Sequence, residues 1–207
     1  MSGHESVSLL VNPLWPSLRR IVADLSAADV RFALVGGLAA GSRTEPRFTR
    51  DIDLAVAVGD DESAETLVRT LLADGYRATA VVEQDATGRL STVRLVPPVD
   101  AGAVIDLLFA SCGIEPEIVA AAESTALAPG LAVPVARAGH LIAMKLLSDS
   151  PQRPQDRIDL VRLGQHIDAA ELALATAAVA LIDARGFSRG RNLGALLEEL
   201  RADLGMA

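Results

Sequence analysis

The chain has 207 residues, of which 50% are hydrophobic and 22% are charged. This composition excludes a disordered chain, which lacks the apolar surface to offset its ordering entropy, and the length allows a catalytic domain with a second lobe. A formal net charge of -8 excludes nucleic-acid binding through the overall field. Any nucleic-acid partner would therefore have to meet a local basic patch.

Neither disulfide bonding nor membrane anchoring is indicated. Cys112 is the only cysteine, which excludes an internal disulfide and a thiolate zinc cluster. Residues 1–11 carry no basic cluster, and the longest apolar run, residues 172–182, is too short to cross a bilayer. We therefore expect no membrane partner and a cytoplasmic location.

The first third of the chain alternates between helical and extended patterns. Asn12 and Pro13 are typical of a helix start, and apolar residues then recur at helical spacing. Residues 32–35 form a short apolar run that ends at a glycine pair, which predicts a strand, a tight turn and a helix. A second strand over 52–58 and an amphipathic helix over 62–73 follow.

The remaining elements fall into a β-rich part and a helical part. Three short apolar runs predict the strands of a meander: 78–82, 90–96 and 103–109. Beyond Gly113 the spacing predicts helices over 115–122, 138–147, 156–163, 169–184 and 193–204. Residues 131–135 are either a last strand or an extended linker.

These elements predict an α+β fold. We expect a mixed, twisted sheet with helices on one face, followed by a helical lobe that closes a cleft. The corresponding domains are a catalytic domain over residues 1–130 and a C-terminal helical lobe over residues 131–207.

Asp51 and Asp53 are the first candidates for chemistry. They stand two residues apart where a strand begins, so both side chains leave the same face while Ile52 points into the core. Two unpaired carboxylates at this distance repel each other, and a hard cation such as Mg²⁺ removes that repulsion. A nucleoside triphosphate would supply the remaining ligands of the metal.

Gly36 and Gly37 precede this pair and lead into a helix. Backbone N–H groups of such a turn and the helix dipole can receive phosphate. The alternative is that the glycines only permit a tight turn or close packing.

Asp106 is a single carboxylate in the apolar segment 104–109. Leaving it unpaired in a buried strand would be costly, so it requires a cation. The strand alone is equally consistent with an edge-strand aspartate that faces water.

Two further groups lie in the helical part. Lys145 is the only lysine and could neutralise the charge of a leaving pyrophosphate, although a surface lysine would also fit. Asp156 and Asp159 lie on one helix face within reach of Arg153 and Arg157, where ordinary ion pairing is the default interpretation. Asp156 could instead orient Lys145.

Several arginines could form a basic rim that faces the carboxylate cleft and receives an acceptor. Three of them lie on the segment directly before Asp51, and they could equally pair with nearby acids. The predicted members of the rim are Arg43, Arg47, Arg50, Arg137, Arg153 and Arg157.

Two short blocks carry a family resemblance. Residues 34–39, with Gly36-Gly37, followed by 47–54, which read Arg47-x-Thr49-x-Asp51-Ile-Asp53, resemble the AbiEii-type and MenT-type branch of the polymerase-beta-like nucleotidyltransferase superfamily. Residues 141–146 and 153–160 are similar to the downstream helical motifs of that branch. The chain departs from the pattern where many members have serine, at Gly37, and where lysine is common, at Gln155.

The resemblance implies a set of roles for the site. Asp51, Asp53 and Asp106 would hold Mg²⁺, and Asp106 would accept the proton of the attacking hydroxyl. Lys145 and Asp156 would complete the catalytic group. The residues implied for nucleotide binding are Gly36, Gly37, Arg47 and Thr49.

The resemblance also implies a function. The chain would be a toxin of a toxin–antitoxin pair, restrained by a cognate antitoxin, that transfers a nucleoside monophosphate from a nucleoside triphosphate to the 3′ end of tRNA. Two alternatives stay open at this point. The acceptor could be a small molecule of the aminoglycoside type or a protein side chain, or the chain could be an interaction module that performs no chemistry.

Overall fold

The computed structural model describes residues 12–84, 88–99 and 102–205. The N-terminal segment 1–11, which entered the expectation about targeting, lies outside the described residues. The strands are β1 (Arg31–Val35), β2 (Asp51–Ala57), β3 (Arg77–Glu83), β4 (Leu90–Val96), β5 (Val104–Leu108), β6 (Glu123–Ala128) and β7 (Leu131–Val135). The helices are α1 (Trp15–Ala27), α2 (Gly36–Arg43), α3 (Asp61–Ala73), α4 (Glu115–Ala120), α5 (Ala138–Ser148), α6 (Pro154–His166), α7 (Ala169–Ala184) and α8 (Leu193–Asp203).

The strands form one mixed sheet in the order β3-β4-β5-β2-β1-β7-β6. β3, β4 and β5 are joined as an antiparallel meander, as the sequence predicts. β5 then runs parallel to β2, and β2 runs antiparallel to β1. This order brings β5 directly beside β2, although about fifty residues separate them in the sequence.

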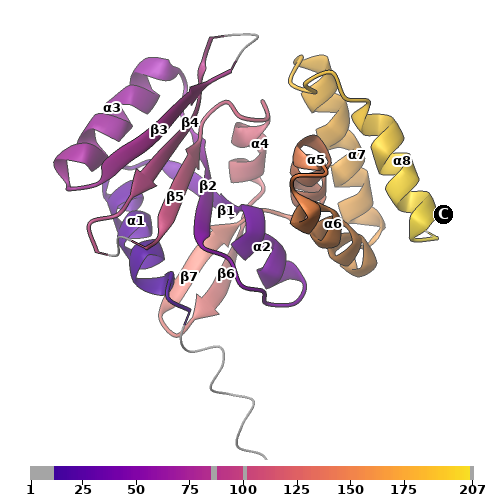
Figure 1. Ribbon diagram of the computed structural model, residues 1–207, viewed down its shortest axis with the longest axis horizontal. Helices are drawn as coiled ribbons and strands as arrows, with labels where there is room; N and C mark the ends of the chain where they lie inside the picture. Colours follow the sequence, from indigo (N-terminus) through magenta and orange to yellow (C-terminus); the bar gives the residue numbers. More distant parts are fainter. Residues whose placement is uncertain (1–11, 85–87, 100–101, 206–207) are drawn as a thin grey trace, which may run out of the picture.

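Helices lie on both faces of the sheet, not on one face as expected. Figure 1 shows α1 and α3 on one side, and α4 on the opposite side, between the sheet and the α5–α8 lobe. Ile114 and Ile118 are fully buried, and α4 packs against β1 and β2. α4 therefore covers part of β1 and β2 on the side of the sheet that faces the lobe.

The sheet continues past residue 130, where the expected catalytic domain ends. Residues 131–135 are a strand, not a linker, because Leu34 of β1 pairs in parallel with Val135 of β7. β6 forms a hairpin with β7 and was not predicted from the sequence. We therefore propose that the catalytic domain extends to Arg137 and that the lobe begins with α5.

Local capping explains where two helices begin. Asp60 accepts a hydrogen bond from the backbone N–H of Ser63 at 2.8 Å, and α3 begins at the next residue. Asp168 accepts from the backbone N–H of Glu171 at 2.8 Å at the start of α7. Side-chain oxygens at this position satisfy N–H groups that the first helical turn leaves unpaired.

The four helices of the lobe agree with the predicted ranges to within a few residues. α5 and α7 approach closely at Gly139, where an added Cβ would lie 2.4 Å from the carbonyl oxygen of Glu171. None of the described helices is long and apolar enough to span a membrane.

Candidate active site

The sheet gathers three carboxylates on the face that looks toward the lobe. Asp51 and Asp53 leave the same face of β2, and Asp106 of β5 is the register partner of Asp53. Ile52 and Leu54 alternate with them and are fully buried on the opposite face, which anchors the pair to the core. The three acids thus come from two adjacent strands that the sequence alone does not identify as neighbours.

A cleft of about 1370 Å³ lies between this face and the helical lobe. Residues from the sheet, from α2, α5 and α6, and from the α7–α8 loop line it. The cleft brings together every residue that the sequence nominated for the site: Gly36, Gly37, Arg47, Thr49, Asp51, Asp53, Asp106, Lys145 and Asp156.

Burial, together with the two neighbouring carboxylates, perturbs Asp53. Burial raises the pKa of Asp53 to about 7, with further contributions from the negative charges of Asp106 and Asp51. Lys145 and a hydrogen bond from the backbone of Gly37 act in the opposite direction. A positive charge placed among the three acids would relieve this repulsion, which is the condition for a divalent cation site.

Asp106 already has a positively charged partner, Arg94 of β4. The Nε of Arg94 donates to Oδ1 of Asp106 at 2.8 Å, and Nη2 donates to Oδ2 at 2.7 Å. The two residues are register partners, and this contact is the first cause of a raised pKa for Arg94. Among the described residues, no set of three acidic, histidine or cysteine side chains is arranged to hold a metal ion.

The glycine pair is required by close packing. Gly36 has φ +65°, and a Cβ there would lie 1.9 Å from Oδ2 of Asp53. A Cβ on Gly37 would lie 2.6 Å from Nη2 of Arg47 and 3.3 Å from Oγ1 of Thr49. The guanidinium group of Arg47 thus fills the space that a serine at position 37 would need. Phosphate binding by this turn stays a prediction.

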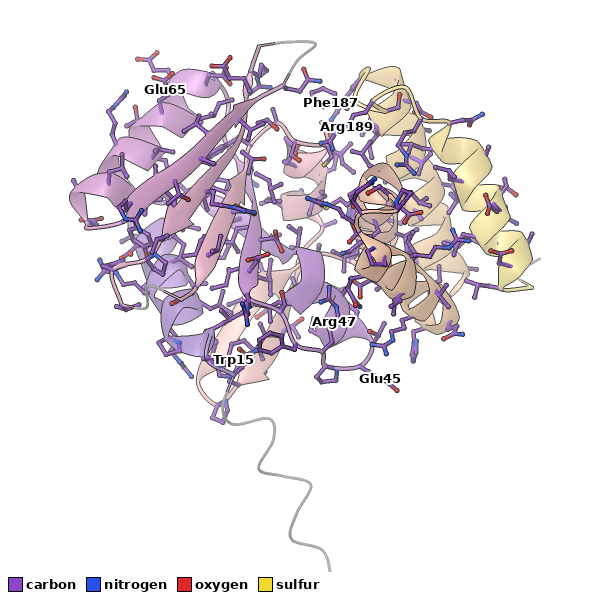
Figure 2. The ribbon with its side chains drawn as sticks, in the orientation of Figure 1. Trp15, Glu45, Arg47, Glu65, Phe187 and Arg189 are labelled. Carbon is purple, nitrogen blue, oxygen red and sulfur yellow. The ribbon has the colours of Figure 1, made fainter. Side chains whose placement is uncertain are left out.

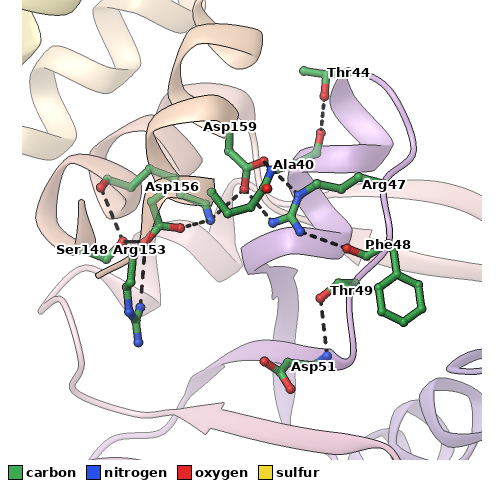
Figure 3. A network of polar contacts seen from close by, with 12 residues as sticks. Ala40, Thr44, Arg47, Phe48, Thr49, Asp51, Ser148, Arg153, Asp156 and Asp159 are labelled. Carbon is green, nitrogen blue, oxygen red and sulfur yellow. Dashed lines mark hydrogen bonds and ion pairs between the residues drawn. The ribbon is translucent and has the colours of Figure 1, made fainter. Parts of the chain in front are cut away.

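Arg47 joins the loop before β2 to helix α6. Its Nε and Nη2 donate to Oδ1 and Oδ2 of Asp159 at 2.9 and 2.7 Å, and the side chain of Asp159 is only 2% exposed. Figure 3 shows this pair between the lobe and the α2–β2 loop. Although burial alone would raise the pKa of Asp159, Arg47 and Lys145 hold it below its ordinary value. Asp159, for which the sequence predicted only ordinary ion pairing, contacts both Arg47 and Lys145.

Lys145 is buried, which excludes the interpretation as a surface lysine. Its Nζ lies 2.5 Å from Oδ1 of Asp156 and 2.9 Å from Oδ2 of Asp159. The other carboxylate oxygen of Asp156 accepts a hydrogen bond from Ser148 at 3.0 Å. Asp156 therefore contacts Lys145 as the sequence suggests, and two acids hold the ammonium group in place.

The prediction of a basic rim around the cleft is wrong. Of its six members only Arg47 and Arg153 line the cleft. Arg43 donates hydrogen bonds to the carbonyl oxygens of Val135 and Ala136. The three other members that do not line the cleft also contact neighbouring side chains. Arg137 pairs with Glu171, Arg157 with Asp203, and Arg50 lies over the ring of Phe48. Arginines that are close together in the sequence therefore do not form a basic rim around this cleft.

Sequence reasoning missed two arginines that line the cleft, Arg94 and Arg189. Arg189 lies on the α7–α8 loop beside Phe187 in Figure 2, with a φ of +55° that a non-glycine residue rarely adopts. Its Nη2 donates to the carbonyl oxygen of Ser111 at 2.8 Å, which links the lobe to the end of β5. The loop carries no periodic pattern, so only the fold reveals its position.

The carboxylate pair at the start of a central strand, the glycine turn before it and the helical lobe across the cleft are features of nucleotidyltransferases. Comparison with known protein families supports this class and identifies one family within it. The family described as nucleotidyl transferase AbiEii toxin, type IV toxin–antitoxin system, matches residues 18–205. The chain therefore belongs to the AbiEii family of nucleotidyltransferase toxins.

Solved structures share the fold at low sequence identity. The solution structure of the antibiotic-resistance factor ANT(2″)-Ia is 18% identical with a TM-score of 0.55, over 90% of this chain and 95% of that chain. An antigenic nucleotidyltransferase-like protein from Paracoccidioides brasiliensis is 16% identical with a TM-score of 0.53, over 91% and 94%. None of the curated proteins matches the chain.

Proposed function

We propose that this protein transfers a nucleoside monophosphate from a nucleoside triphosphate to an acceptor hydroxyl and acts as the toxin of a toxin–antitoxin pair. Membership of the AbiEii family supports the class of reaction. The observation that carries the proposal is the meeting of Asp51, Asp53 and Asp106 in one large cleft, where burial, with a contribution from the two neighbouring acids, raises the pKa of Asp53 to about 7.

In this proposal the carboxylates of the cleft would hold divalent cations after a rearrangement at Asp106. Asp51 and Asp53 leave β2 together, and Asp106 would join them once it separates from Arg94. Burial and the two neighbouring acids raise the pKa of Asp53, so a positive charge at this point would favour its ionised form. Bound Mg²⁺ would supply charge neutralisation for the carboxylates and the triphosphate.

The side chains of the cleft have separable roles in this proposal. The acceptor oxygen forms a bond to the α-phosphorus, the bond from that phosphorus to the bridging oxygen breaks, and pyrophosphate leaves with the electron pair. Asp106 accepts the proton of the acceptor hydroxyl. Lys145, oriented by Asp156, faces the leaving pyrophosphate.

A second group of residues holds the nucleotide. We propose that Gly36, Gly37 and Thr49 contact its phosphates from the sheet side of the cleft. Arg47 keeps its bidentate pair with Asp159 and acts at the edge of the phosphate site. This pair also fixes the helical lobe against the α2–β2 loop that carries Thr49.

For the acceptor we propose the 3′ end of tRNA and a cognate antitoxin as the restraint on the activity, because the family consists of toxins. The arginines of the described residues do not add to this argument, since four of the six expected rim members bind elsewhere. That observation favours a second candidate, a small hydroxylated acceptor of the aminoglycoside type, which would need no extended basic surface.

Labelled nucleotides test the leading proposal. Purified protein is incubated with Mg²⁺, total tRNA and each of the four α-labelled nucleoside triphosphates in turn, and the RNA is separated on a gel and its 3′ ends are sequenced. We expect incorporation with at least one nucleotide, none with Asp53→Asn, and wild-type incorporation with Asp183→Asn, an exposed acid on α7. No label in tRNA with any nucleotide would sink the tRNA proposal.

The alternatives give different results in cells and in solution. A toxin arrests growth when expressed without its antitoxin, whereas a small-molecule transferase leaves growth intact and protects against a drug. A protein acceptor would appear as a labelled polypeptide. An inert interaction module would bind neither nucleotide nor Mg²⁺ in calorimetry, or would bind them equally after Asp51→Asn and Asp53→Asn.

A further inference from the structure

Arg94 binds Asp106, the third carboxylate of the site, through two nitrogens of its guanidinium group. Its Nε and Nη2 reach the two oxygens of Asp106 at 2.8 and 2.7 Å. The strand register fixes the pair, because Arg94 and Asp106 are direct partners across β4 and β5. Bidentate pairs of this kind are among the strongest ionic contacts that a side chain makes.

We infer that Arg94 is an exchangeable counter-cation, which occupies Asp106 while metal and nucleotide are absent and moves to the nucleotide phosphates when divalent cations bind. This inference rests on the proposed function. It assigns to Arg94 two successive partners, a carboxylate in the empty cleft and a phosphate in the loaded one.

Competition at Asp106 is the first step of the argument. Asp106 is 8% exposed, so few directions remain from which a cation can approach it. Both oxygens accept from Arg94, and a divalent cation placed beside them would meet a guanidinium charge within a few ångströms. Metal binding at Asp106 and the bidentate Arg94 pair therefore oppose each other.

Charge balance is the second step. Asp51, Asp53 and Asp106 place three carboxyl groups on two adjacent strands. Lys145 is shared between Asp156 and Asp159 across the cleft, whereas Arg94 directly contacts Asp106, one of the three acids. It supplies in the empty site part of the positive charge that divalent cations would supply in the loaded site.

The position of Arg94 after exchange is the third step. Its side chain is 47% exposed and lines the cleft. A guanidinium that leaves Asp106 therefore stays in the space where the triphosphate of the proposed reaction would lie. Arginine binds phosphate oxygens with the same planar fork that it uses for carboxylates.

Manganese binding tests the competition without using activity. Free Mn²⁺ is measured by electron paramagnetic resonance while the full-length protein is titrated in the absence of nucleotide. We expect Arg94→Gln to bind Mn²⁺ at least about fivefold more tightly than wild type, because the competitor for Asp106 is gone. With a non-hydrolysable nucleoside triphosphate present, the same variant should bind the nucleotide about tenfold more weakly, because one phosphate contact is lost.

Two variants control for charge and geometry. Arg157→Gln removes one positive charge from a pair with Asp203, outside the residues that line the cleft, and should bind Mn²⁺ and nucleotide as wild type does. Arg94→Lys keeps the charge but loses the fork, so its affinity for Mn²⁺ should fall between those of wild type and Arg94→Gln. An ion pair with no role in exchange would leave Mn²⁺ affinity equal in all four proteins.

The outcomes separate this inference from the proposed function. Suppose that wild type binds Mn²⁺ when nucleotide is present, but that in the absence of nucleotide Arg94→Gln binds Mn²⁺ no more tightly than wild type. The exchange of Arg94 is then wrong, and the transferase proposal stands. If wild type binds no Mn²⁺ even with nucleotide, the proposed function itself fails. If Arg94→Gln does not fold, the NMR signal of the Arg94 Nε–H group in wild type tests the inference instead. Exchange requires this signal to shift when Mg²⁺ and nucleotide are added. An unchanged signal overturns the inference.

Discussion

Gly36 and Gly37 show how two missing side chains shape the carboxylate site. Gly36 leaves room for the carboxylate of Asp53, and Gly37 leaves room for the guanidinium of Arg47. The two positions differ in what a side chain would meet. Asp53 sits on a central strand of the sheet, whereas the contact of Gly37 is the far end of a long side chain that can move.

This difference predicts unequal effects of adding one methyl group. Gly36→Ala should lower the free energy of unfolding by about 2 to 4 kcal/mol, because a left-handed backbone and a displaced Asp53 act together, and nucleotidyl transfer should fall by about a hundredfold or more. Gly37→Ala should cost about 1 kcal/mol, since Arg47 can shift. Chemical denaturation and a transfer assay measure both, and equal losses for the two variants would contradict this account.

The pKa of Asp53 predicts how stability depends on pH. Its pKa in the folded protein, about 7, lies above the ordinary 3.8, so between these values the folded protein holds more protons than the unfolded chain. The free energy of unfolding of the metal-free protein therefore falls as the pH rises through this window, and ionised Asp53 is destabilising above it. Asp53→Asn removes the effect.

Thermal unfolding at several pH values checks this. At about pH 8 we expect Asp53→Asn to be more stable than wild type by about 1 to 2 kcal/mol, a few degrees in Tm, and the advantage should vanish near pH 4. Asp183→Asn is the matched control and should follow wild type throughout. A wild-type stability that rises from pH 4 to pH 7 in step with the control, with no gain from Asp53→Asn, would refute the assignment.

At the residue scale the sequence predicts the acids better than their partners. Asp51 and Asp53 are identified by their spacing along one strand, which is a local property. Arg94 is not, because its contact with Asp106 depends on the register of two strands. Arg189 depends on a loop that meets the sheet only in the folded protein.

At the scale of elements, the packing of α5 on α7 positions the lysine of the site. Lys145 lies on α5, and Gly139 on the same helix touches α7 closely enough that a Cβ would lie 2.4 Å from the carbonyl oxygen of Glu171 and 2.8 Å from the backbone nitrogen of Ala175. These are backbone atoms, so no side-chain rotation relieves the contact. A larger residue must push the helices apart.

Gly139→Ala should therefore lower the free energy of unfolding by about 2 to 3 kcal/mol and reduce kcat more than it raises KM, because α5 carries Lys145 away from the sheet. Gly194→Ala on α8 is the control. Its Cβ would meet only Oδ1 of Asn192, at 3.8 Å, so the higher helix propensity of alanine should leave stability unchanged or raise it by up to about 1 kcal/mol. A Gly139→Ala protein as stable as Gly194→Ala would exclude the close approach.

Elements with strong periodicity were predicted closely, and the hairpin of β6 and β7 was not. α7 covers 169–184, as its apolar pattern indicates. β6 reads Glu-Ser-Thr-Ala-Leu-Ala and is largely exposed at the sheet edge, so it carries little of the alternation that marks a half-buried strand. Its partner β7 contains Pro134, which weakens a strand prediction.

At the scale of the whole molecule, the cleft depends on the meeting of two parts that are far apart in the sequence. The carboxylates come from the sheet, and Lys145 with Asp156 comes from the lobe. The pair of Arg47 with Asp159 and the contact of Arg189 with Ser111 cross between these parts. The charge of the chain is -8, yet Arg47, Arg94, Lys145, Arg153 and Arg189 all line the cleft.

Ligand-induced stabilisation should therefore report on both parts together. A nucleoside triphosphate with Mg²⁺ at about a hundred times its Kd should add about 2.7 kcal/mol to the free energy of unfolding, or roughly 5 to 10 °C in Tm. Nucleotide without Mg²⁺ should give a smaller shift, because three carboxylates repel the phosphates when the site holds no divalent cation. Comparison of the four nucleotides by differential scanning fluorimetry then identifies the preferred donor.

Two variants decide whether the shift comes from the cleft. Asp51→Asn removes a proposed metal ligand on the sheet and should lose most of the Mg²⁺-dependent part of the shift. Asp183→Asn, which carries the same change of charge on the exposed face of α7, should retain it. Because stabilisation of the native state requires binding there and not to the unfolded chain, an equal shift in both variants would place the nucleotide outside the carboxylate cleft.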